Sequence, residues 1–424
     1  MAKLVQRYWT SDGGGITRKD RQGCEYFAYI PDKLAGRGFS LDGDVAADVA
    51  DAEASIIRLN AEASSLVNTE SIARMLLRAE AVASSKIEGL SVGARRLLRA
   101  EAARVSQPNS RADVTANEVL GNVDAMAAAL AAATNDSDVT VETILGIHAR
   151  LLAGTELEEH AGRVRTIQNW IGGSSFNPCA AAYVPPPADE VLELLWDLAE
   201  FCNDDSLPTV AQAAIAHAQF ETIHPFVDGN GRTGRALIHL ILRRRGLAPR
   251  TVPPVSLVLA TLSTDYIAGL TGYRYEGDMS SSAAERGINR WIAVFAGCCT
   301  RSVQDAAGFE RRIGEIKGAW RERLGPVRRG SAVDLLVDQI PGTPLVTVTG
   351  AAALIGRSFR ATNLAIDSLL QAGVLHKVTL GRRNRAFEAT EVIEAFTDLE
   401  RRLASPEGDT LVSPPTRAVP ARRD

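Results

Sequence analysis

The sequence lacks the features that mark a disulfide-rich, metal-binding or membrane protein. Its five cysteines, at positions 24, 179, 202, 298 and 299, have no metal-ligand spacing and are odd in number. We therefore expect neither a zinc site nor a disulfide framework, and a reducing cytoplasm fits best. No apolar run approaches membrane-spanning length, and the first residues lack the apolar core of a signal peptide, so we expect no membrane association.

The charge balance shows no bias toward one kind of partner. The formal net charge is −4, charged residues make up 23% of the chain and apolar residues 46%. This is the composition of an ordinary soluble protein, without a global preference for nucleic acid or anionic membranes. The 424 residues suffice for two or three domains and a sizeable core.

Most of the chain has apolar residues at helical spacing, so we predict a mostly α fold. A strand-like run at Tyr26–Ile30 precedes the first helix, and residues 162–187 interrupt the helical pattern as a short hairpin or extended loop. The predicted helices cover residues 44–63, 69–86, 90–105, 112–133, 139–153, 188–203, 210–223, 232–244, 255–271, 284–299 and 302–324.

Shifts in composition divide the chain into five predicted segments. They are an N-terminal region at 1–105, a helical core at 106–300, connecting helices and a linker at 301–340, a compact domain at 341–400, and a proline-containing tail at 401–424 that we expect to be disordered.

The twelve residues from His224 to Arg235 concentrate groups that bind phosphate and move protons. They read His-Pro-Phe-Val-Asp-Gly-Asn-Gly-Arg-Thr-Gly-Arg and lie between two predicted helices. Their glycines allow backbone N–H groups to turn toward one centre, and the start of the second helix adds positive potential. Arg232 and Arg235 share one helix face and can bind phosphate oxygens together. The run therefore predicts a polyphosphate site beside a possible base, His224.

This run resembles the signature of the Fic family, His-Pro-Phe-x-(Asp/Glu)-Gly-Asn-Gly-Arg-x-x-Arg, at every specified position. The resemblance implies a Fic-type helical core with a short β-hairpin flap, and an enzyme that transfers AMP from ATP to a hydroxyl group of a target protein. The alternative is a structural loop with a capping aspartate and a buried histidine. Nine specified positions in the correct order argue against that alternative.

The resemblance implies distinct roles for the acid and the base of the run. His224 would take the proton of a target Ser, Thr or Tyr hydroxyl as it attacks the α-phosphorus of ATP, and pyrophosphate would leave. Asp228 would bind Mg²⁺. His217 and His239, on the flanking helices, are better explained as packed or surface residues than as catalysts.

The resemblance also assigns the ATP phosphates to the rest of the run. The loop backbone would hold the phosphates, the Asn230 side chain would orient the α-phosphate, and the two arginines would bind the β- and γ-phosphates. The Phe226 ring would point into the body and fix the shape of the loop. The implied ATP-binding residues are Asp228, Gly229, Asn230, Gly231, Arg232, Gly234 and Arg235, with Tyr266 as a possible neighbour of the adenine.

Residues 162–173 resemble the family's flap, an edge that receives the target backbone as an added strand. Trp170 and Ile171 would then dock the target. The alternative is an ordinary hairpin that packs these two side chains into the core. Tyr266 likewise has an alternative as a core residue, because a helical aromatic usually packs inside.

Ser84-Ser-Lys-Ile-Glu88-Gly89 resembles the inhibitory motif (Ser/Thr)-x-x-x-Glu-(Gly/Asn) of regulated Fic proteins. The resemblance implies that the Glu88 carboxylate pairs with Arg235 and so occupies the donors that the γ-phosphate of ATP needs. Gly89 fits the left-handed residue that ends a helix. The alternative is an ordinary helix terminus.

Residues 346–389 resemble a winged helix-turn-helix, with Gly381-Arg-Arg-Asn-Arg385 as a basic wing. Six Lys or Arg residues stand against one Asp between Arg357 and Arg385, so contacts with DNA phosphates are physically possible. Because the chain as a whole is slightly acidic, we favour dimerisation or target docking for this segment over DNA binding.

The sequence thus indicates a cytoplasmic protein adenylyltransferase that uses ATP and Mg²⁺, is restrained by Glu88, and acts on a protein target or on itself. Two other functions stay open. One is a hydrolase that removes AMP through the same site, and the other is a transcriptional regulator whose Fic body senses nucleotide.

Overall fold

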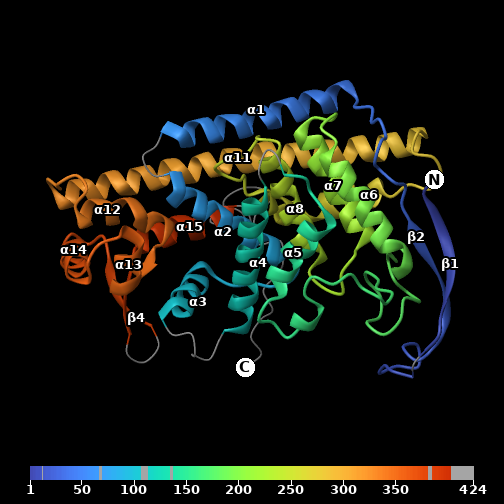
Figure 1. The fold of residues 1–424 in the computed structure, drawn as a ribbon, viewed down its shortest axis with the longest axis horizontal. Helices are drawn as coiled ribbons and strands as arrows, with labels where there is room; N and C mark the ends of the chain where they lie inside the picture. Colours follow the sequence, from blue (N-terminus) through green and yellow to red (C-terminus); the bar gives the residue numbers. More distant parts are fainter. Residues whose placement is uncertain (12, 66–68, 107–112, 134–136, 381–383, 403–424) are drawn as a thin grey trace, which may run out of the picture. The chain divides into compact units, whose positions relative to one another are not determined.

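The computed structural model describes residues 1–11, 13–65, 69–106, 113–133, 137–380 and 384–402 (Figure 1). Contacts divide the chain into two compact units. The first unit comprises residues 1–58, 121–249 and 264–300, and the second comprises residues 59–120, 250–263 and 301–424. The predicted tail at 401–424 lies almost wholly outside the described residues, and the middle of the predicted wing, 381–383, also lies outside them.

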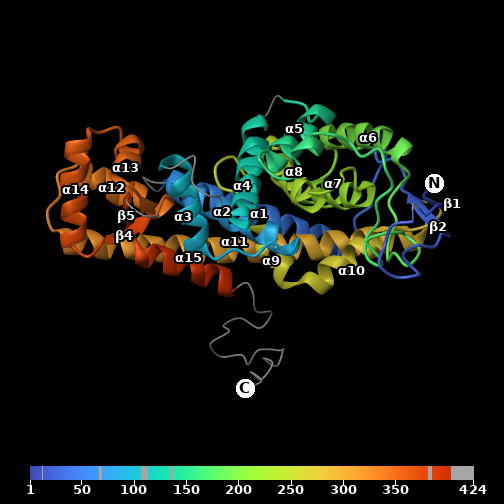
Figure 2. The same cartoon turned by 90° about the horizontal axis from the view of Figure 1, so that it is seen from below.

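The first unit is built around α7 (Thr209–Ile223), which packs against α6 (Val191–Asn203) and α8 (Asn230–Arg244) (Figures 1 and 2). Every residue of α7 is buried, which explains its alanine-rich sequence without a polar face. Small side chains let neighbouring helices approach it on all sides. Helix α5 (Val141–Leu152) covers α8. The predicted buried helix before the loop is confirmed.

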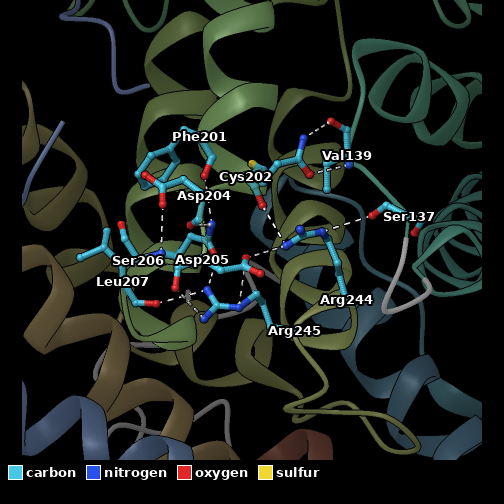
Figure 3. A network of polar contacts seen from close by, with 12 residues as sticks. Ser137, Val139, Phe201, Cys202, Asp204, Asp205, Ser206, Leu207, Arg244 and Arg245 are labelled. Carbon is cyan, nitrogen blue, oxygen red and sulfur yellow. Dashed lines mark hydrogen bonds and ion pairs between the residues drawn. The ribbon is translucent and has the colours of Figure 1, made fainter. Parts of the chain in front are cut away.

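The C-terminal end of α8 is fixed by a polar network (Figure 3). The Arg244 guanidinium donates to the Asp205 carboxylate at 2.8 Å and to the Ser137 carbonyl at 3.2 Å. Arg245 donates to the Gln212 side chain at 2.7 Å and to the Leu207 carbonyl at 3.2 Å. Cations at a helix C-terminus are favoured by the helix dipole. Both arginines therefore hold α8 in place from the end opposite the phosphate loop.

A two-stranded antiparallel hairpin forms the N-terminus of the first unit. Strand β1 (Lys3–Trp9) pairs with β2 (Cys24–Ile30), with Lys3 opposite Ile30 and Trp9 opposite Cys24. The predicted strand at Tyr26–Ile30 is confirmed, but its partner β1 was not predicted, because Lys, Gln and Arg interrupt its apolar pattern.

One prediction from the cysteines is wrong: Cys24 is disulfide-bonded to Cys179. The 154 residues between them hide the pairing from a spacing argument. Cys202, Cys298 and Cys299 form no disulfide bond and are buried, as is usual for cysteines that pack as small apolar residues.

The second unit centres on α2 (Thr69–Ile87), which packs on α9 (Val255–Thr261) and α15 (Thr390–Arg402). The Glu80 carboxylate, at the middle of α2, accepts hydrogen bonds from the backbone N–H and the hydroxyl of Ser256 on α9. Arg78 bonds to Glu101 of α3 (Ala94–Ser106) at 2.6 Å and to the Gly342 carbonyl at 2.7 Å.

The C-terminal elements of the second unit share their core with α3. Leu98 of α3 packs against Leu345, Ala386 and Ile393. The elements are α12 (Ala332–Gln339), β3 (Leu345–Val346), α13 (Val348–Ile355), α14 (Phe359–Gln371), β4 (His376–Leu380) and β5 (Asn384–Glu388), and the sheet is antiparallel in the order β3-β5-β4. This order of elements agrees with the predicted winged helix, which stays a prediction. The predicted boundary at residue 341 lies between Leu98 and the three residues that it packs against, and it stays a prediction.

Two predicted helix boundaries differ from the structure. The predicted helix at 255–271 is two helices, α9 and α10 (Ser263–Tyr273), broken at Leu262. The predicted helices at 284–299 and 302–324 are one, α11 (Ser282–Leu324), because no proline or glycine stands between Cys299 and Ser302 to end it. The remaining long helices are α1 (Gly43–Ser65) and α4 (Val114–Ala132).

Within the described ranges, no single helix combines the length and the apolar character needed to cross a membrane, and only α9 and α10 taken together meet both criteria.

Candidate functional site

His224 ends α7 in the left-handed conformation, with φ 50° and ψ 61°. Across the parts of the chain that the structure describes, it is the sole residue other than glycine with positive φ. Its N–H donates to the Phe220 carbonyl at 2.9 Å, and its own carbonyl accepts from Arg165 at 2.9 Å. Such backbone costs on the order of 1–3 kcal/mol and is typical of functional sites. The surrounding contacts therefore hold the candidate base in a conformation that it would not adopt alone.

The loop after His224 is closed by Asn230, the first residue of α8. Its Oδ1 accepts from the Phe226 N–H and its Nδ2 donates to the Phe226 carbonyl, both at 2.8 Å. Asn230 is 3% exposed and Phe226 is fully buried, as predicted for the ring. The Asn230 side chain thus shapes the loop, and its predicted contact with the α-phosphate stays a prediction.

His148 of α5 is a positioning residue that the sequence analysis did not find. Its ring stacks on Phe226 with 3.7 Å between centroids, and its Nδ1 accepts from the Gly162 N–H at 3.1 Å. Nε2 therefore carries the proton and donates to the Asp228 carbonyl at 3.0 Å. Burial lowers the pKa of His148 to about 4, so the ring is neutral at pH 7. One ring thus joins α5, the start of the flap and the phosphate loop.

Gly229 is required by both conformation and space. It caps α8 with φ 79°, and a Cβ atom there would stand 2.7 Å from the Leu151 Cδ2 atom. Helix α8 begins directly after it, so its first turn carries the positive end of the helix dipole at the loop. The predicted phosphate-binding glycine thus stands at a helix N-terminus, as expected.

Asp228, which lies just before α8, forms an ion pair with Arg232 in the first turn of that helix. Oδ2 of Asp228 lies 2.6 Å from Nη2 of Arg232, and the Asp228 side chain is 48% exposed against 6% for Arg232. Among the described residues, no group of three or more His, Cys, Asp or Glu side chains could hold a metal ion. A half-exposed single carboxylate fits Mg²⁺ that arrives with a nucleotide, because such ions use one or two carboxylates together with phosphates and water.

Gly234 and Arg235 lie on the buried side of α8. A Cβ atom at Gly234 would stand 2.8 Å from Phe220 and 2.9 Å from Glu221, so this glycine lets α7 and α8 approach closely. That packing role accounts for Gly234 without a contact to ATP. Arg235 is 1% exposed. The pKa of His217 is lowered to about 3, mainly because His217 is buried and secondly because the positive charge of Arg235 is close to it.

Tyr266 of α10 lies in the core of the first unit. It is 5% exposed, its hydroxyl lies 2.8 Å from Nε2 of His217, and its ring packs against Trp291. The alternative reading as a core aromatic accounts for this position, and a contact with adenine stays a prediction. His217 and His239 are both fully buried, in agreement with the packing role predicted for them.

The predicted flap, residues 162–173, is part of an extended loop at residues 162–186, which we call the flap, with one bridge between Ile171 and Tyr183. Two side chains join the base of the flap to the loop from His224 to Gly229. The Arg165 guanidinium donates to the carbonyls of His224 and Pro186, and the Asn169 amide donates to the Phe226 carbonyl at 3.0 Å. The flap edge is therefore held in register with His224.

The two predicted docking residues differ in their surroundings. Trp170 donates from Nε1 to the Ser174 carbonyl at 2.7 Å and packs edge-on against Trp9 of β1. Ile171 is 38% exposed and provides the bridge to Tyr183. Trp170 thus packs the flap against β1, whereas Ile171 lies at the exposed edge of the flap.

The predicted inhibitory motif ends α2 in the second unit. Helix α2 stops at Ile87, Gly89 has φ 83°, and its N–H donates to the Lys86 carbonyl at 3.0 Å. Ser84 is fully buried and Glu88 is exposed. The predicted left-handed glycine is confirmed. The pairing of Glu88 with Arg235, which belongs to the first unit, stays a prediction.

Comparisons with known proteins agree with this geometry. Residues 138–242 match the family model of the Fic/DOC family, and residues 46–131 match that of the Fic/DOC family N-terminal region. Protein adenylyltransferase fic-1 of Caenorhabditis elegans is 34% identical over 160 residues, which are 37% of this chain and 29% of the relative. Protein adenylyltransferase Fic of Drosophila melanogaster is 34% identical over 140 residues, which are 32% of this chain and 26% of the relative. The chain therefore spans less than a third of the length of these relatives.

A crystal structure of a Fic family protein from Desulfovibrio desulfuricans G20 has a similar fold. The TM-score is 0.50 at 20% sequence identity, with 83% of this chain and 97% of that chain covered. The predicted mostly α fold with a Fic-type core is thereby confirmed.

Proposed function

We propose that this chain is a protein adenylyltransferase of the Fic family, which transfers AMP from ATP to a hydroxyl group of a target protein or of itself. The observation that carries the proposal is the loop from His224 to Gly229, in which a strained histidine, a half-exposed carboxylate and a helix N-terminus lie within six residues. Similarity to proteins named protein adenylyltransferase supports it.

His224 acts as the general base. A target hydroxyl loses its proton to the imidazole while its oxygen attacks the α-phosphorus, and the bond from that phosphorus to the β-phosphate oxygen breaks. Arg165 and the end of α7 hold the backbone of His224 in its left-handed conformation, and this fixes the position from which the imidazole extends. A positioned base of this kind typically contributes ~10²–10⁴-fold.

The first turn of α8 binds the triphosphate. Its dipole and the guanidinium of Arg232 supply positive charge, and the buried Arg235 supplies a further cation. Mg²⁺, bound by Asp228 together with the phosphates, would neutralise charge that develops on the leaving pyrophosphate. Binding of that ion requires Asp228 to share or release its partner Arg232, which is then free to meet a phosphate oxygen.

The flap presents the target. An extended segment of the target adds along the exposed edge at Ile171, and main-chain hydrogen bonds set its hydroxyl over His224. Asn169 and Arg165 bond the base of the flap to the backbone of the loop that carries His224. The segment that would bind the target and the loop that would bind ATP are therefore fixed to each other.

Glu88 restrains this activity by pairing with Arg235. The guanidinium of Arg235 can form charge-assisted hydrogen bonds with a carboxylate or with a γ-phosphate, so Glu88 and ATP would compete for it. When Glu88 holds Arg235, ATP binds with its phosphates displaced, so that in-line attack on the α-phosphorus fails.

The test uses the purified full-length chain with Mg²⁺ and ATP that carries its label on the α-phosphate or, separately, on the γ-phosphate. The proposal predicts protein-bound label from the α-position alone. Label from the γ-position would indicate a kinase reaction, and no label from either, including after Glu88→Gly, would refute AMP transfer.

A further inference from the structure

The disulfide between Cys24 and Cys179 joins the N-terminal hairpin to the tip of the flap. Cys24 begins β2, and Cys179 lies between the two bridging residues of the flap, Ile171 and Tyr183. Cys179 is exposed and Cys24 is partly exposed. The bond is therefore open to reagents in solution, in contrast to Cys202, which is buried.

Other contacts hold these two segments together without the disulfide. The Asn177 amide donates to the carbonyls of Lys19 and Asp20 at 3.0 Å each, and the Ser174 hydroxyl donates to the Asp20 carboxylate at 2.6 Å. The hydrogen bond from Ser174 is the largest cause that lowers the pKa of Asp20, to about 2, so this acceptor stays ionised at neutral pH. Reduction would consequently leave the two thiols near each other.

The fold does not depend on this bond as a small secreted domain would. Disulfides are essential where a domain cannot build a sufficient core. The first unit instead has a core that includes Trp291, Phe220 and Phe295, all fully buried, and both cysteines lie outside it. The disulfide constrains the flap tip rather than the core.

We propose that Cys24 and Cys179 form a reversible thiol–disulfide site, at which a small-molecule disulfide such as oxidised glutathione locks the flap tip to the hairpin. The consequence for target docking rests on the proposed function, because it is the flap edge that would receive the target strand. The oxidised state holds residues 172–182 in one position, and the reduced state leaves them tied through the hydrogen bonds to Lys19 and Asp20.

The chemistry balances as two exchanges. The more exposed Cys179 thiolate attacks one sulfur of the small disulfide, forms a mixed disulfide and displaces one small thiolate. The Cys24 thiolate then attacks the Cys179 sulfur and displaces the second small thiolate. Two protein thiols are oxidised to one disulfide, the small disulfide is reduced to two thiols, and the two protons lost by the protein are taken up by the leaving thiolates.

The first experiment measures the bond itself. The full-length native protein is equilibrated with reduced or oxidised glutathione, alkylated with iodoacetamide and weighed intact. We expect two alkylated sites after reduction and none of these two after oxidation. Cys24→Ala should retain one glutathione on Cys179 under oxidising conditions, whereas the matched control Cys202→Ala should behave as wild type. A pair that stays oxidised in reduced glutathione until the protein unfolds, or that never forms a disulfide, would overturn the proposal.

The second experiment measures the flap. Hydrogen exchange at the amides of Ile171, Ala182 and Tyr183 should be roughly tenfold or more slower in the oxidised protein, because a cross-link typically stabilises the segments it joins by at least that factor. Equal exchange in both states would overturn the coupling to the flap. Neither readout requires AMP transfer, so a protein that passes both but carries no label from ATP would refute the proposed function and leave the thiol–disulfide site standing.

Discussion

Replacing His148 with Phe separates the packing of this ring from its hydrogen bonds. Phenylalanine preserves the stack on Phe226 but removes the acceptor for the Gly162 N–H and the donor to the Asp228 carbonyl. Leaving a buried polar group unpaired costs about 1–3 kcal/mol, and both backbone groups here are only partly buried, so water can reach them. We therefore expect a loss of about 2 kcal/mol in the free energy of unfolding at pH 7, near the lower end of the roughly 2–6 kcal/mol for two groups.

The stability difference between the wild type and His148→Phe should depend on pH, which a pure packing effect would not cause. Burial lowers the pKa of His148 to about 4, below its unfolded value of roughly 6.5. The unfolded chain therefore binds one more proton between these values, and the neutral ring's stabilisation is complete above pH ~6.5 and lost as the pH falls toward 4. As the pH falls through this range, the free energy of unfolding of the wild type decreases by up to about 1.4 kcal/mol per pH unit because of His148, and that of His148→Phe lacks this decrease. Between pH 7 and pH 5 the gap between the two proteins should narrow by about 2 kcal/mol.

The assay is urea unfolding of both proteins at pH 7 and pH 5, together with the rate of AMP transfer at pH 7. The exposed His376, replaced by Phe, is the matched control and should change neither quantity. The rate of AMP transfer should fall more than tenfold in His148→Phe, because the Asp228 carbonyl loses the hydrogen bond that positions it. A rise of about 1.4 kcal/mol in the activation free energy suffices for a tenfold decrease. A constant stability gap across the two pH values would refute the neutral, proton-donating state of His148.

Three further predictions concern the rest of the site. Glu88→Gly should raise the rate of AMP transfer roughly tenfold or more, as expected from loss of a charged hydrogen bond. The double variant Glu88→Gly with Arg235→Ala should not show this increase. Incorporation of labelled AMP measures both rates, and an unchanged rate in Glu88→Gly would refute inhibition by Glu88. Asp228→Ala should lower turnover and raise the Mg²⁺ concentration needed for half-maximal rate, and a metal-independent rate in both proteins would contradict the assigned role. For the C-terminal elements we expect dimerisation or target docking rather than DNA binding, so duplex DNA should leave the sedimentation coefficient of the protein unchanged. A protein–DNA complex that weakens steeply with added salt, and also when the exposed Arg360 is changed to Glu, would contradict that expectation.

The phosphate loop was predictable from sequence because its chemistry is local. Gly229 needs positive φ, the helix start follows it directly, and the residues predicted to bind phosphate stand close together around the first turn of α8. The signature therefore carries its own geometry. Periodicity likewise predicted α7 as buried, since it has no polar face.

The residues that support the loop were not predictable because they come from distant segments. His148 stands 80 residues before Asp228 and has no motif of its own, and Arg165 reaches the His224 carbonyl from the flap. The Cys24–Cys179 bond joins segments 155 residues apart. Each depends on tertiary approach, which neither spacing nor propensity encodes.

The core shared by α3 and the C-terminal elements was not predictable for a related reason. Composition marks residue 341 as the start of a separate domain, but Leu98 of α3 completes the core formed by Leu345 and Ile393. A change in composition indicates where a linker runs, whereas a shared core depends on which apolar faces meet.

The central claim is tested most directly by the intact mass of the full-length chain after incubation with ATP and Mg²⁺, for wild type, Glu88→Gly and Glu88→Gly with His224→Ala. We predict an increase by one or more AMP residues that is largest in Glu88→Gly and falls by ~10²–10⁴-fold in rate when His224 is also replaced. AMP incorporation at an equal rate with and without His224, in proteins whose folding is verified, would contradict the account.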